Sequence, residues 1–314
     1  MNARDLIRHV IQAHDEGRPV AVCAVVATRG STPQPPGAMI VVDEAANLFG
    51  TLGGGCVEAE VRRRAHQELR GRGRVATFEL DTDFGHDDGM ICGGQMDIAL
   101  SPVTPTTNID AHRAATEAPP GAEAWVPLRV LDGENLVEYR VCIESQPRLY
   151  IAGAGHISRV IADLAVPLQF EVDVIDDRSQ YANEQRFPEP IRTHVGDIAR
   201  TLKSLPVDGN TYIVIVTRGH RHDEAALRAV IDAPAKYIGM IGSRRKVKVI
   251  FDDLKHAGVA DDQLARVHAP IGLDIGAVTV EEIGISIAAQ LVQTRRAARA
   301  KPVQGPVPVS EATA

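Results

Sequence analysis

Two cysteines stand beside glycine runs, and a thiol in that setting can act as a soft ligand. The runs are Gly53-Gly54-Gly55-Cys56 and Cys92-Gly93-Gly94. Successive glycines free the backbone to wrap around a ligand. Cys56 is expected at the N-terminus of a helix, where the helix dipole lowers the pKa of a thiol. Thiolates suit molybdenum, copper or persulfide sulfur, whereas the alternative for each cysteine taken singly is a small buried apolar residue.

A second kind of glycine motif, Gly153-Ala154-Gly155-His156-Ile157-Ser158, lies between an expected strand and an expected helix. Glycine at its first two positions lets the chain turn sharply, so that the helix N-terminus can bind a pyrophosphate. Ser158 takes the third glycine position and is small enough for close packing. Asp176 ends the next strand about 20 residues after Gly155, the spacing of an acid that binds a ribose hydroxyl. The motif predicts a Rossmann-type fold, and the alternative for its glycines is packing alone.

A run of cations follows a further expected strand in Gly242-Ser243-Arg244-Arg245-Lys246. Ser243 is the expected N-cap of a helix, so that the three cations fall in the first turn. Positive charge there opposes the helix dipole unless an anion neutralises it. The run therefore predicts an anionic ligand or partner, with a solvated basic face as the alternative.

Two histidines come close together in His220-Arg221-His222-Asp223, a run that can bind a metal or line a loop. The segment 268–276 carries glycines and precedes the last expected helix. It can reach a ligand crevice, because loops at the carboxyl ends of parallel strands form that crevice. Six arginines make the segment 57–74 basic in an acidic chain, which indicates at least a solvated helix face.

The first half of the chain has the pattern of a mixed α+β domain. Hydrophobic spacing predicts helices over 3–16 and 57–69, and strands over 20–28, 38–42, 48–52, 75–79, 96–100, 125–131 and 136–143. We expect this smaller N-terminal α+β domain to span 1–146. Within it, the proline-rich stretch 101–121 is expected to be a linker or a surface excursion.

From residue 148, strands alternate with helices, which predicts a parallel sheet. The expected strands cover 149–152, 170–175, 211–216 and 237–241, and the expected helices run to 166 and over 224–231, 244–256 and 279–296. The fold class is therefore α/β, with a C-terminal Rossmann-like domain over 147–297. The segment 298–314 has no period and is expected to be a disordered tail.

Composition narrows the function classes. The chain has 314 residues, with 34 Lys and Arg against 41 Asp and Glu, which gives a formal charge of −7. This balance argues against a general nucleic-acid binder. We expect no membrane span, because no stretch reaches ~18 uninterrupted apolar residues. Four cysteines without a C-x-x-C pair predict reduced thiols in a cytoplasmic protein. A nucleophile elbow, a P-loop and H-E-x-x-H are absent from the sequence, which removes several hydrolase classes.

Eight motifs recur in an order that resembles a known family. They are Ala27–Pro33, Leu52–Glu58, Cys92–Gly94, Gly153–His156, Asp176–Arg178 with Arg186–Pro188, Thr217–His220, Tyr237–Arg245 and Pro270–Gly276. Together they resemble the xanthine dehydrogenase accessory factors, the XdhC/CoxI family, over roughly residues 5–296. The sequence departs from the family pattern at Val280, where proline is common, and at Ser158.

The resemblance implies a molybdenum cofactor-binding chaperone rather than a catalyst. Such a protein holds the cofactor for sulfuration by a cysteine desulfurase and delivers it to a molybdenum hydroxylase apoenzyme of the xanthine dehydrogenase type. The arginine segment could contact such a partner, and a homodimer is expected. The candidate cofactor-binding residues are Gly53, Gly54, Gly55, Cys56, Cys92, Gly93, Gly94, Gly153, Gly155, His156, Asp176, Gly242, Ser243 and Arg244, with Cys56 and Cys92 as possible molybdenum contacts.

Two other functions remain open from the residues alone. The glycine motif with Asp176 also fits an NAD(P)-dependent oxidoreductase, in which His220 or His222 would serve as acid or base. A third hypothesis is a docking protein whose Rossmann domain binds no ligand. Binding of NAD(H) or of molybdenum cofactor by the purified protein would separate the three.

Overall fold

The computed structural model describes residues 1–80, 93–119, 122–297 and 302–309. The chain divides into two compact units. The first comprises Met1–Ser145 with Ala300–Ala314, and the second comprises Gln146–Arg299. The two units are of similar length, so that the N-terminal domain is not markedly smaller as the sequence had indicated.

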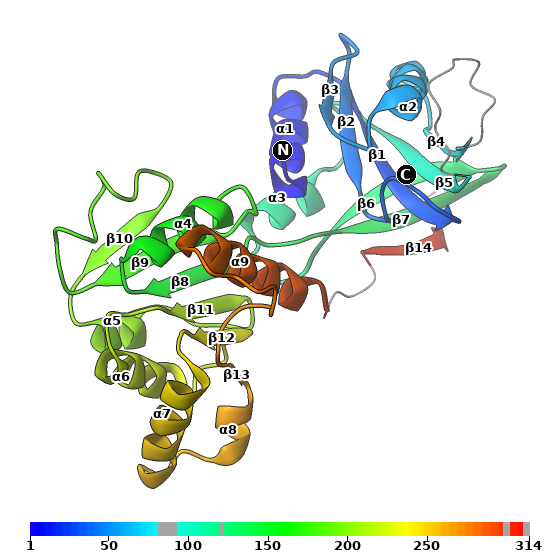
Figure 1. The fold of residues 1–314 in the computed structure, drawn as a ribbon. Helices are drawn as coiled ribbons and strands as arrows, with labels where there is room; N and C mark the ends of the chain where they lie inside the picture. Colours follow the sequence, from blue (N-terminus) through cyan, green and yellow to red (C-terminus); the bar gives the residue numbers. More distant parts are fainter. Residues whose placement is uncertain (81–92, 120–121, 298–301, 310–314) are drawn as a thin grey trace. The chain divides into compact units, whose positions relative to one another are not determined.

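The first unit is built on an eight-stranded sheet in the order β14-β7-β6-β4-β5-β1-β2-β3 (Figure 1). Its strands are β1 Val20–Arg29, β2 Met39–Asp43, β3 Leu48–Gly50, β4 Arg74–Glu79, β5 Gln95–Val103, β6 Ala124–Asp132, β7 Asn135–Ile143 and β14 Val303–Pro308. Paired neighbours run antiparallel except β4 and β6, which are parallel. The continuous apolar run of β1 is explained by burial on both faces of this sheet.

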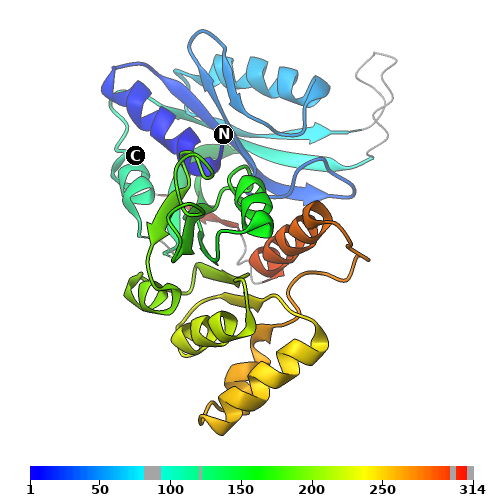
Figure 2. The same ribbon diagram turned by 60° about the vertical axis from the view of Figure 1, so that its left-hand side comes forward.

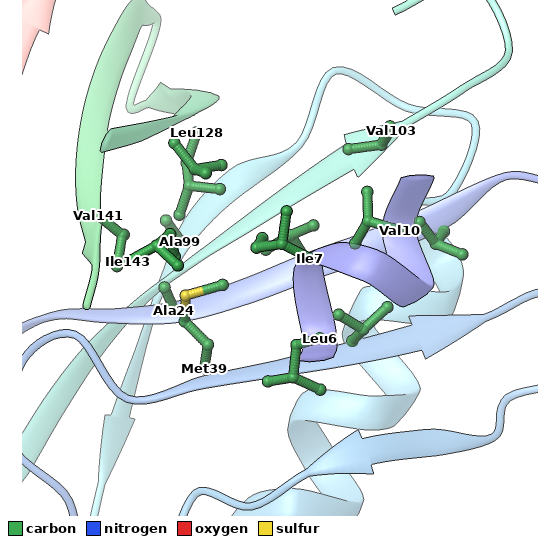
Figure 3. Close-up of a cluster of buried hydrophobic side chains, with 14 of the residues drawn as sticks. Leu6, Ile7, Val10, Ala24, Met39, Ala99, Val103, Leu128, Val141 and Ile143 are labelled. Carbon is green, nitrogen blue, oxygen red and sulfur yellow. The ribbon is translucent and has the colours of Figure 1, made fainter. Parts of the chain in front are cut away.

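Helices cover both faces of this sheet. The helices α1 (Ala3–Asp15) and α3 (Asp110–Glu117) lie on one face, and α2 (Gly55–Glu68) lies on the other (Figure 2). Figure 3 shows Leu6, Ile7 and Val10 of α1 against side chains of the sheet. On the opposite face, Val57 and Val61 of α2 are buried in a separate core. Because both cores are apolar, the loops at the strand ends are held in place from two sides.

The stretch 101–121, expected to be a linker, is ordered over its described part. The strand β5 continues through Val103, and α3 lies inside the stretch with His112 and Ala115 buried. The prolines stand outside the helix and mark its limits, since proline is excluded from a helix interior but not from its flanks. Residues 120–121 lie outside the described residues.

The tail, expected to be disordered from residue 298, contains the strand β14. This strand pairs antiparallel with β7, with Val303 opposite Val141 and Pro308 opposite Val137. A strand rich in proline and valine has no signal of its own, because its order depends on a partner that is distant in the sequence. The residues 298–301 and 310–314 lie outside the described residues.

The second unit is a doubly wound α/β domain, as the sequence predicts. Its six strands lie in the order β10-β9-β8-β11-β12-β13, and all neighbours are parallel. They are β8 Arg148–Ala152, β9 Glu171–Asp176, β10 Arg192–Val195, β11 Thr211–Ile215, β12 Tyr237–Met240 and β13 Val267–His268. Numbered along the chain, this is the order 3-2-1-4-5-6 of a Rossmann fold, whose ligand crevice opens between the first and fourth strands. Here those strands are β8 and β11.

The helices of the second unit cover both faces of its sheet (Figure 1). They are α4 His156–Ala165, α5 Ile198–Ser204, α6 His220–Val230, α7 Arg244–His256, α8 Asp261–Ala265 and α9 Val280–Ala297. The helices α4 and α9 pack on one face, and α5, α6 and α7 pack on the other. The short elements β10, α5, α8 and β13 were not expected from the sequence, because each has too few residues to show a period.

Candidate functional site

The glycine turn after β8 lies at the crevice of the second unit. Gly153 has a φ of +106°, and a Cβ at this position would lie 2.5 Å from the carbonyl oxygen of Val216. Gly155 is the N-cap residue of α4, and a Cβ there would meet open space. Within the described chain, no side chain caps this helix. Gly153 is therefore required by the fold, whereas Gly155 leaves free N–H groups and room in front of them.

Asp176 does not present a free carboxylate to this crevice. It is buried, and its Oδ2 accepts hydrogen bonds from the Ala154 N–H at 2.8 Å and from Nη2 of Arg178 at 3.0 Å. Its Oδ1 accepts from the Arg178 N–H at 3.0 Å and from Nε of Arg178 at 2.8 Å. Burial raises the pKa of Asp176, but these hydrogen bonds outweigh burial and leave the pKa below its ordinary value. The carboxylate expected to bind a ribose hydroxyl is thus saturated by the chain itself.

The neighbouring turn after β11 contains a fully buried acid. Asp223 accepts hydrogen bonds from the Thr217 hydroxyl at 2.6 Å and the Thr217 N–H at 3.1 Å, and it forms an ion pair with Lys246. The run that begins at His220 is the first turn of α6, which starts four residues earlier than the sequence predicted. Among the described residues, no cluster of three His, Cys, Asp or Glu side chains could hold a metal ion. This finding is evidence against a metal site at His220 and His222.

The cation run at the start of α7 is partly neutralised. Ser243 is the N-cap, as predicted, and its hydroxyl accepts from the Lys246 N–H at 3.3 Å. A Cβ on Gly242 would lie 3.1 Å from the Lys246 side chain. Arg244 and Arg245 are exposed. Since Lys246 already pairs with Asp223, only the two arginines of this described run face solvent as free cations.

In the first unit, the run Gly53-Gly54-Gly55 is a turn in the left-handed region. The φ angles are +109°, +81° and +71°, a conformation that favours glycine at each position. The helix α2 begins at Gly55, two residues before the predicted start, so that Cys56 is its second residue. The predicted placement of Cys56 at a helix N-terminus is therefore confirmed. Cys92 lies outside the described residues.

Glu58 binds the glycine turn from inside the helix. Its Oε1 accepts hydrogen bonds from the Thr51 hydroxyl at 2.6 Å, the Leu52 N–H at 2.7 Å and the Gly54 N–H at 2.8 Å. Burial raises the pKa of Glu58, but these donors outweigh burial and leave the pKa lowered. The sequence analysis missed this role, although an acid in the first turn of a helix was an available signal. The turn is thus fixed by an internal anion.

A third loop joins the two glycine–cysteine runs. A Cβ on Gly53 would lie 2.5 Å from the Pro33 side chain, and a Cβ on Gly94 would overlap the carbonyl of Ser31. Ser31 also forms a β-bridge with Gly93. The loop 31–33 therefore touches the backbone next to Cys56 and the backbone that follows Cys92. By contrast, Cβ atoms at Gly54 and Gly93 would meet open space, which leaves room for a ligand at the same place.

The remaining cysteines behave differently from these two. Cys23 is fully buried in β1, and burial raises the pKa of its thiol. Cys142 lies in β7 and is half-buried. Neither position adjoins a glycine run. Cys23 is thus a small buried apolar residue, the alternative that the sequence left open for a single cysteine.

Comparison with known proteins places both units in one family. Residues 13–79 match the XdhC and CoxI family, and residues 149–291 match the XdhC Rossmann domain. The chain belongs to the XdhC and CoxI family. This confirms the resemblance that the eight motifs indicated.

Three curated relatives carry names that bear on function. The chain is 30% identical over 299 residues to the uncharacterized protein YqeB of Escherichia coli K12, which covers 93% of this chain and 46% of that protein. It is 30% identical over 154 residues to a probable xanthine dehydrogenase component of Bacillus subtilis, covering 49% and 44%. It is 23% identical over 303 residues to the molybdenum cofactor insertion chaperone PaoD of E. coli, covering 93% and 88%. The chain thus spans less than half the length of the first two.

A solved structure supports the fold. The crystal structure of a xanthine dehydrogenase from Bacillus halodurans aligns with a TM-score of 0.76 at 21% identity, covering 95% of this chain and 97% of that one. A likeness at this identity concerns the fold alone. No helix in the described residues is both long and apolar enough to span a membrane.

Proposed function

We propose that this protein is a molybdenum cofactor chaperone. It holds the cofactor while the terminal sulfido ligand is installed and then delivers it to a hydroxylase of the xanthine dehydrogenase type. One observation carries the proposal: the loop 31–33 contacts both glycine–cysteine runs, beside the helix turn that holds Cys56. The relation to PaoD over 88% of that protein's length supports the same function.

The chemistry of the first unit suits soft sulfur. A thiol at a helix N-terminus ionises more easily, because the helix dipole stabilises the thiolate. A thiolate is a ligand that molybdenum accepts and a group that can carry sulfur. Open space in front of Gly54 and Gly93 admits a ligand close to the backbone. Cys56, with Cys92, is therefore the proposed contact to the metal or its sulfur.

The second unit offers a site for the phosphorylated part of the cargo. The N-terminus of α4 has no side-chain cap within the described chain, and Gly155 leaves room in front of it. Backbone N–H groups and the helix dipole together favour a phosphate there. Gly153, Gly155 and His156 are the proposed contacts. Arg244 at the start of α7 adds positive charge within the same unit.

The proposed partners follow from the function. They are a cysteine desulfurase that supplies sulfur and the apoenzyme of a molybdenum hydroxylase that receives the cofactor, and the proposed assembly is a homodimer. The exposed arginines of α2 and of the following turn, Arg62 and Arg70 among them, are a candidate contact with an acidic partner surface. The alternative of an NAD-dependent oxidoreductase is weakened, because Asp176 has no acceptor position left for a ribose diol.

The test is activation of a partner hydroxylase by thiol variants. The protein is co-expressed with a xanthine dehydrogenase-type apoenzyme, and Cys56→Ala and Cys92→Ala are compared with Cys142→Ala as a control thiol. We expect the first two variants to fold and to yield hydroxylase with about a tenth of the activity or less. The control is expected to behave as wild type. Full activation by the Cys56→Ala, Cys92→Ala double variant would defeat the role of the thiols.

A direct measurement separates binding from delivery. The protein is purified from a host that makes molybdenum cofactor, and its molybdenum and pterin content is determined. We expect close to one equivalent of each per chain in wild type and loss of molybdenum from the Cys56→Ala variant. Protein that carries neither metal nor pterin, yet captures a hydroxylase apoenzyme, would instead support the pure docking function.

A further inference from the structure

Two guanidinium groups share one aromatic ring at the carboxyl end of β9. The Arg178 guanidinium lies 3.9 Å from the centre of the Tyr181 ring, and the Arg186 guanidinium lies 5.2 Å from it. Two cations on one ring repel each other unless anions offset their charge. The question is therefore which anions this cluster already contains.

Arg178 is matched by Asp176. Its Nε and Nη2 bind the two carboxylate oxygens at 2.8 and 3.0 Å, a bidentate pair. This pairing uses two of the five N–H donors of the guanidinium, and the side chain remains 28% exposed. Arg178 thus keeps donors for a further acceptor, whereas Asp176 keeps no free lone pair.

The second acid at this strand end is also engaged. Asp177 receives a bidentate pair from Arg218, with both N–O distances at 2.8 Å. Within the described chain, therefore, neither acid of the Asp176-Asp177 pair is left to neutralise Arg186. The chain's own anions balance Arg178 and Arg218 only.

Arg186 is held in position without an anion. Its backbone N–H donates to the Asn183 side chain at 3.1 Å, which fixes the turn that carries it. Its Nε is buried and has no hydrogen-bond partner among the described residues. A buried guanidinium N–H without an acceptor is costly, and an incoming anion removes that cost.

We infer that Arg178 and Arg186, on either side of Tyr181 in the sequence, form a binding site for a phosphate monoester. The carboxyl end of the second strand is where a Rossmann crevice receives the part of a ligand remote from the glycine turn. An arginine at this end accommodates a phosphate, whereas a free carboxylate there selects a ribose diol. Here the carboxylate is saturated and the guanidinium groups have donors to spare.

The ligand chemistry is a phosphate monoester, and it has two sources. One is the phosphate of the molybdenum cofactor, and this link rests on the proposed function. The other is the 2′-phosphate of an NADP-type dinucleotide, which NAD lacks. The test distinguishes them by using NADP⁺, NAD⁺ and molybdenum cofactor as separate probes.

The experiment measures binding of each probe to the full-length protein by calorimetric titration. We expect wild type to bind NADP⁺ at least about tenfold more tightly than NAD⁺, which corresponds to about one charge-assisted hydrogen bond. The variant Arg186→Gln is expected to lose this preference, and Arg186→Lys to keep part of it. Arg200→Gln, an exposed cation on α5 of the same unit, is the control and keeps the preference. Thermal unfolding of each variant establishes that the unit is folded.

Each outcome decides a separate point. A wild-type protein without preference for NADP⁺ over NAD⁺, whether both bind or neither does, overturns the inference. An Arg186→Gln variant that keeps the preference also overturns it. Loss of the preference in Arg186→Gln, with unchanged binding of molybdenum cofactor, supports the monoester site and assigns it to a dinucleotide. Wild type that binds no molybdenum cofactor, yet shows an Arg186-dependent preference, defeats the proposed function and leaves the site standing.

Discussion

At the residue scale, each glycine turn is bound by a carboxylate of the chain itself. Glu58 accepts N–H groups of the turn before α2, and Asp176 accepts the Ala154 N–H in the turn before α4. Both acids have a lowered pKa, because donors that favour the ionised form outweigh burial. The two acids therefore set the shape of the turns rather than offering their charge to a ligand.

The role of Glu58 can be tested by stability. Replacing Glu58 by Ala leaves the N–H groups of Leu52 and Gly54 without their acceptor, and we expect a loss of about 1–3 kcal/mol in the free energy of unfolding. Glu58→Gln keeps an acceptor oxygen and loses less. Urea unfolding at pH 7 measures both. A Glu58→Ala variant as stable as wild type would show that the turn holds its shape without this carboxylate.

The sign of the pH dependence follows from the lowered pKa. The contribution of Glu58 is fully present above its ordinary pKa of 4.5, because the carboxylate is then ionised in both folded and unfolded chains. It is lost as the pH falls through the lower pKa of the folded state. Wild type is therefore expected to lose more stability than Glu58→Gln between pH 5 and pH 3.

At the element scale, the turn between β8 and α4 uses its two glycines for different purposes. Gly153 packs against the strand end at Val216 with a positive φ, and Gly155 faces open space with an ordinary φ of −76°. A side chain at the first position collides with backbone, which cannot move aside cheaply. A side chain at the second position only fills the space where a phosphate would bind.

A pair of substitutions separates these purposes. Gly153→Ala is expected to destabilise the second unit by more than about 2 kcal/mol, from left-handed strain and the contact with the Val216 carbonyl. Gly155→Ser is expected to leave stability unchanged or improved, since serine is a good N-cap, and to weaken ligand binding. Chemical unfolding and the titrations above measure the two effects. Equal stability of the two variants would contradict this assignment.

The packing of α3 on the first unit creates a second element-scale prediction. His112 of α3 is buried, and neither ring nitrogen has a hydrogen-bond partner among the described residues. Burial, aided by the nearby His14, lowers the pKa of His112 to about 4. The unfolded chain therefore takes up the proton first as the pH falls.

The consequence is a loss of stability in a defined pH window. As the pH falls from 6.5 toward 4, wild type is expected to lose about 3 kcal/mol of unfolding free energy that His112→Leu does not lose. The contribution is complete above pH 6.5 and changes no further below pH 4. Urea titrations at half-unit pH steps give both profiles. Parallel profiles for the two proteins would contradict a buried neutral histidine.

At the scale of the whole molecule, the chain passes from the first unit to the second and back again. The strand β14 follows the last helix of the second unit and adds to the sheet of the first, next to β7. Without it, β7 would be an open edge with free N–H and C=O groups. The C-terminal strand is thus a structural part of the N-terminal unit.

Truncation tests this arrangement. A chain that ends at residue 297 loses β14, and we expect the first unit to lose about 3 kcal/mol, at about 1 kcal/mol for each of the strand's hydrogen bonds. It should also associate through the exposed edge of β7. Hydrogen exchange in β7 and size-exclusion chromatography measure the two effects. A chain that ends at residue 309 keeps the strand and is the matched control. Unchanged exchange in β7 of the shorter chain would be evidence against the pairing.

Local sequence patterns were sufficient for much of the fold and part of the site. The alternation of strands and helices after residue 148 predicted the parallel sheet, because each element buries one apolar face with its own period. The glycine at 153 and the N-cap at Ser243 were predicted correctly, since each reflects a local backbone requirement. Short elements such as β10 and β14 were missed, because partners elsewhere in the chain stabilise them.

The sequence by itself determined the residue types at the site: two thiols next to glycines, a pyrophosphate-type turn and a cluster of cations. It also determined the family, since eight ordered motifs occur together. Only the tertiary structure decided which groups remain available. Asp176 was expected to bind ligand and is saturated by Arg178 and Ala154, whereas Arg186, which the sequence did not single out, keeps an Nε without a partner among the described residues. The physical reason is that a charged group's role depends on which donors and acceptors the fold brings within about 3 Å, and spacing along the chain does not specify those distances.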